Sequence, residues 1–225
     1  MRYAYNQQPA GLRIDPKFAL DESYEALLRD IAWGMIVRGE IETNDFLERL
    51  DEGERNGLSE EALSEIFASL VSARRRQQSA WTEAQTKPRL TTAFEELEAQ
   101  GILCRQNFSC CGACASAEIY DERGESRSWR GYVWYHMQDL DGLLEHGSTH
   151  VGYGAFAEAF TNEASWTSLE SEQRTRMYRD WTVGLMKEVV IPTLQRHGVG
   201  VDWNGDLGRR ICLNDVDFYA QLPMP

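Results

Sequence analysis

The spacing of apolar residues changes near Lys87-Pro88, and this change constrains the fold more than any other feature of the sequence. Before it, apolar residues recur at intervals of three and four, which is typical of amphipathic helices. After it, short runs of β-branched and aromatic residues alternate with helical segments. The sequence therefore predicts an α+β protein: a helical subdomain over residues 1–87, then a mixed sheet with helices and a C-terminal hairpin over residues 88–225.

The helical part is expected to hold three helices. Asp21 can cap the first, which Gly39 ends, and Thr43 starts a shorter one. Ser59 opens the third, which is expected to continue through three arginines toward Trp81. A break follows, because the residue before a proline avoids helix.

The sheet part is expected to begin with a helix that Thr92 and Glu95 start as a capping box and Gly101 closes. The other expected elements are strands at 102–108, 131–138 and 150–156, helices at 113–121, from Asp139 through Leu144 and at 171–197, and a hairpin of 200–203 with 209–213 around Asn204-Gly205. Pro192 is expected to kink the longest of these helices.

Size and charge limit the classes of function. With 225 residues, 42% of them hydrophobic, the chain can build a core without disulfides. A net charge of −13, spread along the chain, disfavours nucleic acid and anionic membranes as partners and is compatible with a basic protein partner. No apolar run approaches the roughly 18 residues of a membrane span, and the start does not resemble a signal peptide. We therefore expect a soluble, cytoplasmic protein.

Three of the five cysteines, Cys110, Cys111 and Cys114, fall within the stretch NFSCCGACASAEI. Cytoplasmic cysteines are normally reduced, so such a cluster favours metal binding or reactivity over a structural bridge. A helix beginning after Cys111 would lower the pKa of its thiol, as in thioredoxin-like redox proteins. Those proteins place a cis-proline against the pair, and this chain has no proline between Pro88 and Pro192. Packing as small apolar side chains in a tight turn is the alternative.

Zinc is the cofactor that this cluster could bind. Zinc takes four protein ligands in structural sites and three plus water in catalytic ones. His136 lies near the end of the expected strand 131–138, and parallel strands would bring that end beside the cysteine turn. We expect Cys111, Cys114 and His136 to be the metal ligands, unless the two strands are antiparallel.

Polar residues at two strand ends are the candidate ligand-binding set. Gln138 and Asp139 follow His136, while Asp202 and Trp203 flank the hairpin. Cys111, His136 and Asp139 also have the composition of a nucleophile, base and orienting acid. The alternative reading makes Asp139 a helix cap and His136 a hydrogen-bonded core residue.

Three segments resemble an uncharacterised bacterial family of domains of unknown function: RLTTAFEELEAQGILCRQNFSCCGACASAEI, GYVWYHMQD and GVDWNGDLGRRI. Members of that family carry a CCxxC turn, a YVFFHMQD-like strand and a VEWDG-like hairpin. Ala115 stands where the family has glycine, and Asn204 where it has aspartate. The resemblance covers most of residues 88–213 and implies no activity.

The sequence favours a protein that acts by binding a small molecule or partner, with the cysteine turn organising the site. A thiol- or zinc-dependent enzyme using Cys111, Cys114 and His136 is the second hypothesis. An acidic inhibitor or immunity-type protein that binds a basic partner is the third.

Overall fold

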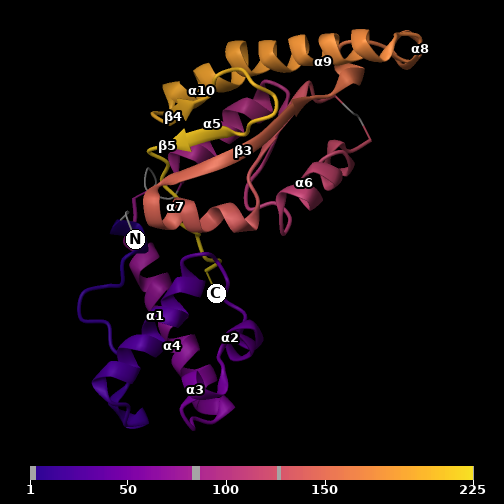
Figure 1. Cartoon of the computed structure of the whole chain (residues 1–225). Helices are drawn as coiled ribbons and strands as arrows, with labels where there is room; N and C mark the ends of the chain where they lie inside the picture. Colours follow the sequence, from indigo (N-terminus) through magenta and orange to yellow (C-terminus); the bar gives the residue numbers. More distant parts are fainter. Residues whose placement is uncertain (1–3, 83–86, 126–127, 225) are drawn as a thin grey trace. The chain divides into compact units, whose positions relative to one another are not determined.

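The computed structural model describes residues 4–82, 87–125 and 128–224 (Figure 1). These residues form two compact units. One comprises the N-terminal helices together with the C-terminal segment from Tyr219 onward, and the other runs from Lys87 to Phe218. Whether each unit folds by itself, as the expected domains 1–87 and 88–225 imply, stays a prediction.

The helical unit contains α1 (Glu22–Ile36), α2 (Thr43–Arg49), α3 (Glu52–Arg55), α4 (Glu60–Ser79) and the 3₁₀ turns Ala4–Asn6 and Pro16–Phe18. The side chains of Asp21 and Ser59 cap α1 and α4 as predicted, each accepting a backbone N–H three residues on. The short helix α3 was not predicted; it begins with a capping box between Asp51 and Glu54.

Two polar side chains of α4 hold the C-terminal segment against the helical unit. The amide of Gln78 donates to the backbone carbonyl of Leu222 at 2.6 Å and accepts its N–H at 2.8 Å. The guanidinium of Arg74, which is fully buried, donates to the backbone carbonyls of Tyr5 and Ala220. Buried side chains of this kind must satisfy their hydrogen bonds, so they fix the path of the segment.

The sheet unit contains helices α5 (Arg89–Ala99), α6 (Gly112–Glu118), α7 (Leu140–His146), α8 (Glu163–Thr167), α9 (Ser171–Leu185) and α10 (Ile191–Arg196). Its strands are β1 (Ile102–Arg105), β2 (Gly131–Trp134), β3 (Ser148–Ala155), β4 (Gly200–Asp202) and β5 (Ile211–Asn214). Shorter turns are the 3₁₀ segments Asp121–Arg123, Met137–Asp139 and Ala157–Ala159 and the π segment Met186–Val190.

The strands form one sheet in the order β1-β2-β3-β5-β4. β1 and β2 are parallel, and the other pairs are antiparallel. The predicted hairpin is confirmed as β4–β5. A mixed sheet with flanking helices confirms the α+β class.

The expected start of α5 was wrong. The helix begins at Arg89, and Thr92 lies inside it, with its hydroxyl 3.4 Å from the carbonyl of Pro88. The carboxylate of Asp217 accepts the backbone N–H of Arg89 at 3.0 Å, so a distant residue supplies the cap. Glu95, the second residue of the expected capping box, forms an ion pair with Lys87 instead.

Pro192 is accommodated by a change of helix type. Residues Met186–Val190 form a π turn between α9 and α10. A proline has no N–H to donate to the preceding turn, and π turns are a common way to absorb such a defect.

The two faces of the sheet differ in cover. Ile102, Val133, Val151, Ile211 and Leu213 are buried on the face toward α5, α9 and α10. On the opposite face, Leu103, Tyr132 and Trp134 pack with Ala115 and Ile119 of α6. β3, β5 and β4 extend this second face with polar side chains. Among the described residues, no helix has the length and apolar character that crossing a bilayer requires.

Candidate functional site

The cysteine turn lies directly beside the chain that leaves β2. The backbone N–H of Phe108 donates to Tyr135 at 2.9 Å, and that of Met137 donates to Ser109 at 3.1 Å. Asn107 and Ser109 have φ of +50° and +62°, so the chain reverses sharply there. Because β1 and β2 are parallel, the turn and His136 meet at one edge of the sheet. Parallel strands are the arrangement that the predicted metal site of Cys111, Cys114 and His136 requires.

The turn gathers three sulfur atoms. The Sγ atoms of Cys110, Cys111 and Cys114 all lie within 4.8 Å of one another. Cys110 is exposed and the other two are half-buried, and none of the five cysteines is bridged. A cluster of thiols at this spacing is able to hold a metal ion.

The three thiols are electrostatically unequal. The backbone N–H of Cys114, then its thiol and the N–H of Ala113, lower the pKa of Cys111 by hydrogen bonding to the sulfur. The thiols of Cys110 and Cys111 raise the pKa of Cys114 to about 11. Burial raises the pKa of Cys104 and of Cys212. The turn therefore favours one thiolate, at Cys111.

His136 packs against the backbone of this turn. A Cβ at Gly112 would lie 3.5 Å from its Nε2, an ordinary van der Waals distance, so the imidazole lies directly beside this residue. Nε2 is 3.3 Å from Nη1 of Arg210, and because a guanidinium only donates, this contact is a hydrogen bond when Nε2 carries a lone pair. Burial lowers the pKa of His136, and Asp139 partly opposes this shift. Nδ1 of His136 lies 3.2 Å from Oδ2 of Asp139, but the two atoms do not form a hydrogen bond.

In the described part of the chain, the group of ligand atoms within 4.8 Å of one another contains Cys110 as its third member, and it does not contain His136. The set Cys111, Cys114 and His136 therefore stays a prediction. The hydrolytic arrangement of Cys111, His136 and Asp139 also stays one. In both, the imidazole would use Nε2, which now faces Arg210.

Asp139 stands at the predicted cap position of α7, but its carboxylate takes part in the capping box of the preceding 3₁₀ turn Met137–Asp139 and does not bond to α7. The carboxylate binds Arg210 through both guanidinium nitrogens, at 3.1 and 2.5 Å, and accepts the backbone N–H of His136 at 3.1 Å. The pair with Arg210 uses both carboxylate oxygens, and such bidentate charge-assisted pairs are among the stronger hydrogen bonds in proteins. Sequence reasoning missed Arg210 as a site residue, although it lies within GVDWNGDLGRRI, one of the three family-like segments.

A pocket of about 410 Å³ opens on the polar part of the same sheet face. Its lining includes Asp202 and Trp203, as well as His150, Asn204, Arg209, Arg210 and Cys212. Asp139 reaches the pocket only through Arg210, and Gln138 is exposed and does not line it. The predicted ligand-binding role of these four residues stays untested.

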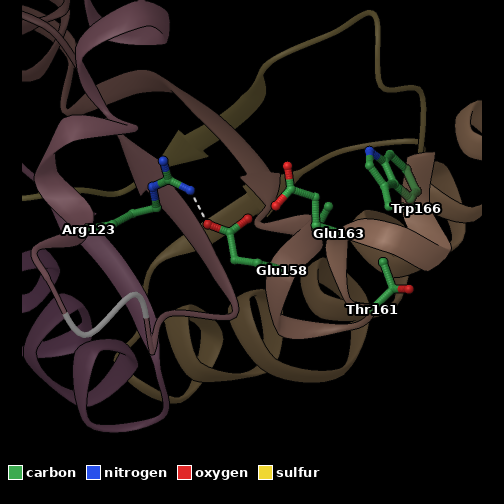
Figure 2. Close-up of a pocket in the computed structure, with 6 residues that line it drawn as sticks. Arg123, Glu158, Thr161, Glu163 and Trp166 are labelled. Carbon is green, nitrogen blue, oxygen red and sulfur yellow. Dashed lines mark hydrogen bonds and ion pairs between the residues drawn. The ribbon is translucent and has the colours of Figure 1, made fainter.

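A second pocket, of about 280 Å³, was not predicted (Figure 2). Arg123 forms an ion pair with Glu158 on one wall, and Glu163 and Trp166 stand across from it. The guanidinium of Arg123 also lies 5.2 Å from the centre of the Phe156 ring. The pairing occupies Arg123, so none of the described residues that line this pocket offers an unpaired cation to an anionic ligand.

Comparison with known proteins gives a family and no closer relative. A family model described as "Domain of unknown function (DUF6891)" matches residues 19–221. No curated protein and no solved structure matches the chain.

Proposed function

The chain belongs to the family of the domain of unknown function DUF6891, and on that premise we propose that it binds a thiophilic divalent cation, of the zinc type, at the cysteine turn. The observation that carries the proposal is the gathering of three sulfur atoms, those of Cys110, Cys111 and Cys114, within 4.8 Å. The turn then acts as the organising part of a binding site.

The spacing suits tetrahedral coordination. Zinc–sulfur bonds of about 2.3 Å place sulfur ligands roughly 3.8 Å apart. The sulfurs need to approach by about 1 Å at most, which small rotations of the exposed Cys110 and the half-buried Cys111 and Cys114 side chains supply. Metal binding releases thiol protons, and the lowered pKa of Cys111 reduces that cost for the first ligand.

Three thiolates leave the fourth position of zinc for another group. The imidazole of His136 is the candidate from the protein, because it packs beside Gly112 of the same turn. A water or an external ligand is the alternative, and with water the site would match the pattern of a catalytic zinc. A zinc-dependent enzyme is the finer form of this proposal.

The number of zinc ions bound per chain tests the proposal directly. The protein is purified, exchanged into chelator-free buffer with excess zinc removed, and its bound zinc measured by mass spectrometry. Replacing Cys110, Cys111 and Cys114 by serine should remove one equivalent of zinc. Cys104→Ala, which deletes a buried thiol outside the turn, is the matched control and should retain it. Equal zinc content in both variants would overturn the proposal.

Thiol–disulfide exchange by Cys111 and Cys114 is a second candidate, favoured by their opposite pKa shifts. The Cys111 thiolate would attack a substrate disulfide, releasing one thiolate, and Cys114 would then displace the second and close an internal disulfide. To test for exchange, metal-free protein is titrated with oxidised glutathione, and the disulfides that form are mapped. An internal Cys111–Cys114 disulfide distinguishes thiol–disulfide exchange from metal binding alone. A mixed disulfide that never resolves to Cys111–Cys114 would exclude this candidate.

A third role, as an inhibitor of a basic partner, rests on the net charge of −13 alone. An inhibitor of this kind would bind its basic partner much more weakly as the salt concentration rises, because salt screens the attraction between exposed charges.

A further inference from the structure

We propose that His150, Cys212 and Asp202 form a second divalent-cation site, distinct from the cysteine turn, with one coordination position open to the 410 Å³ pocket. The site goes beyond the proposed function, because it uses none of the residues of the turn.

Strand register puts these three residues in one row. His150 of β3 is the direct partner of Cys212 of β5, and Cys212 is the direct partner of Asp202 of β4. Directly paired residues project from the same face, with Cβ atoms roughly 4.5–5.5 Å apart. The row therefore presents an imidazole, a thiol and a carboxylate side by side.

The chemistry of the row is that of a zinc site. Cysteine, histidine and aspartate are its usual protein ligands, and three of them with one open position is the catalytic pattern. All three side chains line the same pocket, so an ion among them would be reachable from solvent. The ion would replace the proton of the Cys212 thiol, and one proton would be released.

The side chains are available for such a role. Within the described residues, the ring of His150 and the carboxylate of Asp202 make no hydrogen bond or ion pair, and both residues are exposed. The Cys212 thiol has only a 3.7 Å contact to Asn214. The three ligand atoms do not yet gather at one point. Closing the site requires the two exposed side chains to turn toward Cys212. Of these two, Asp202 has the shorter side chain, and its carboxylate reaches the ion directly or through a bound water.

The neighbouring charges permit a cation. Arg210 also lines the pocket, but Asp139 holds it in a bidentate pair. The guanidinium of Arg209 is exposed, and its Nε lies 3.9 Å from the carboxylate of Asp206. Each arginine thus has a carboxylate beside it, while Asp202 has no cationic partner among the described residues.

The test counts zinc in four forms of the full chain. These are the natural protein, the turn variant with Cys110, Cys111 and Cys114 replaced by serine, the row variant His150→Ala/Cys212→Ser, and the combination of both. His146→Ala, at an exposed histidine of α7, is the matched control. Circular dichroism verifies that each variant is folded. Cobalt then replaces zinc, because a thiolate-to-cobalt absorption band reports a cysteine ligand.

We expect two equivalents of zinc in the natural protein, one in each single-site variant, and none in the combination. The turn variant should show a cobalt–thiolate band that Cys212→Ser abolishes. A turn variant that binds no zinc overturns the second site and leaves the proposed function standing. One equivalent that survives in the turn variant and is lost in the row variant supports the second site and contradicts the proposed function. No zinc in any form overturns both.

Discussion

Cys111 differs from the other cysteines of this chain in what surrounds its sulfur. It stands at the position before α6, next to the first backbone N–H groups of that helix. The N–H groups of Cys114 and Ala113 favour its thiolate, so the pKa of Cys111 is lowered, whereas burial raises the pKa of Cys212. Reactivity toward alkylating agents follows the thiolate.

We predict that Cys111 is alkylated before Cys212 in the metal-free protein. Because a lowered pKa means that the thiolate forms at lower pH, the labelling rate of Cys111 should rise at lower pH than that of Cys212. Mass spectrometry of peptides after limiting iodoacetamide, from pH 6 to 9, measures both rates in one sample. Equal or slower labelling of Cys111 would contradict the hydrogen-bonding argument.

Asp139 is the residue that joins the cysteine edge to the pocket. Its carboxylate is largely buried, pairs with Arg210 and accepts the N–H of His136. Removing its charge leaves a guanidinium that is two-thirds buried without its counter-ion. Breaking a buried pair is costly, and the partial exposure of Arg210 reduces the cost.

We predict that Asp139→Asn lowers the free energy of unfolding by about 2 kcal/mol. Chemical denaturation followed by tryptophan fluorescence measures the change. Asp121→Asn, at an exposed carboxylate, should change stability by less than about 0.5 kcal/mol. An equal effect of the two substitutions would mean that the Asp139–Arg210 pair contributes nothing.

At the scale of elements, two glycines of β3 leave room for aromatic side chains of the neighbouring strand β2. Gly152 and Gly154 are the direct partners of Trp134 and Tyr132 on the same face. A Cβ at Gly152 would come within 2.3 Å of the indole of Trp134. The missing side chain lets the indole lie across the strand, where the guanidinium of Arg210 sits 5.3 Å from its centre.

Gly152→Ala is therefore predicted to destabilise the protein by about 2 kcal/mol, through overpacking against the indole. Gly184→Ala provides the opposite control, because a Cβ there meets no atom within 4 Å and α9 gains a better helix former. It should stabilise by up to about 1 kcal/mol. Thermal unfolding of the two variants measures both signs, and similar shifts would refute the packing argument.

Elements with a local cause were predictable, and those with a distant cause were not. Asp21 and Ser59 cap their helices through residues three positions away, which the sequence displays. The start of α5 depends on Asp217, more than a hundred residues later, and no local pattern reveals it.

The site divides in the same way. The cysteine spacing and the position of His136 were visible in the sequence. The pairing of Asp139 with Arg210, and the row across β3, β5 and β4, depend on strand order and register. Neither can be read from one strand alone.

At the scale of the whole molecule, all residues discussed for binding belong to the unit Lys87–Phe218. The C-terminal segment from Tyr219 onward belongs to the helical unit, where Gln78 pairs with the backbone of Leu222. Both proposed sites therefore lie in the sheet unit.

We predict that a chain of residues 87–218 keeps its sheet and its cysteine turn. Circular dichroism should show strand signal, and limiting alkylation should still label Cys111 first. Loss of strand signal in this fragment would mean that the two units fold as one cooperative structure.

The central claim is that the three sulfurs of the cysteine turn bind one metal ion. X-ray absorption at the zinc edge tests it most directly, using the His150→Ala/Cys212→Ser variant so that only the turn can be loaded. The account predicts three sulfur neighbours at about 2.3 Å and one nitrogen or oxygen neighbour at about 2.0–2.1 Å. A spectrum with only nitrogen and oxygen neighbours, or a protein that retains no zinc, would contradict it.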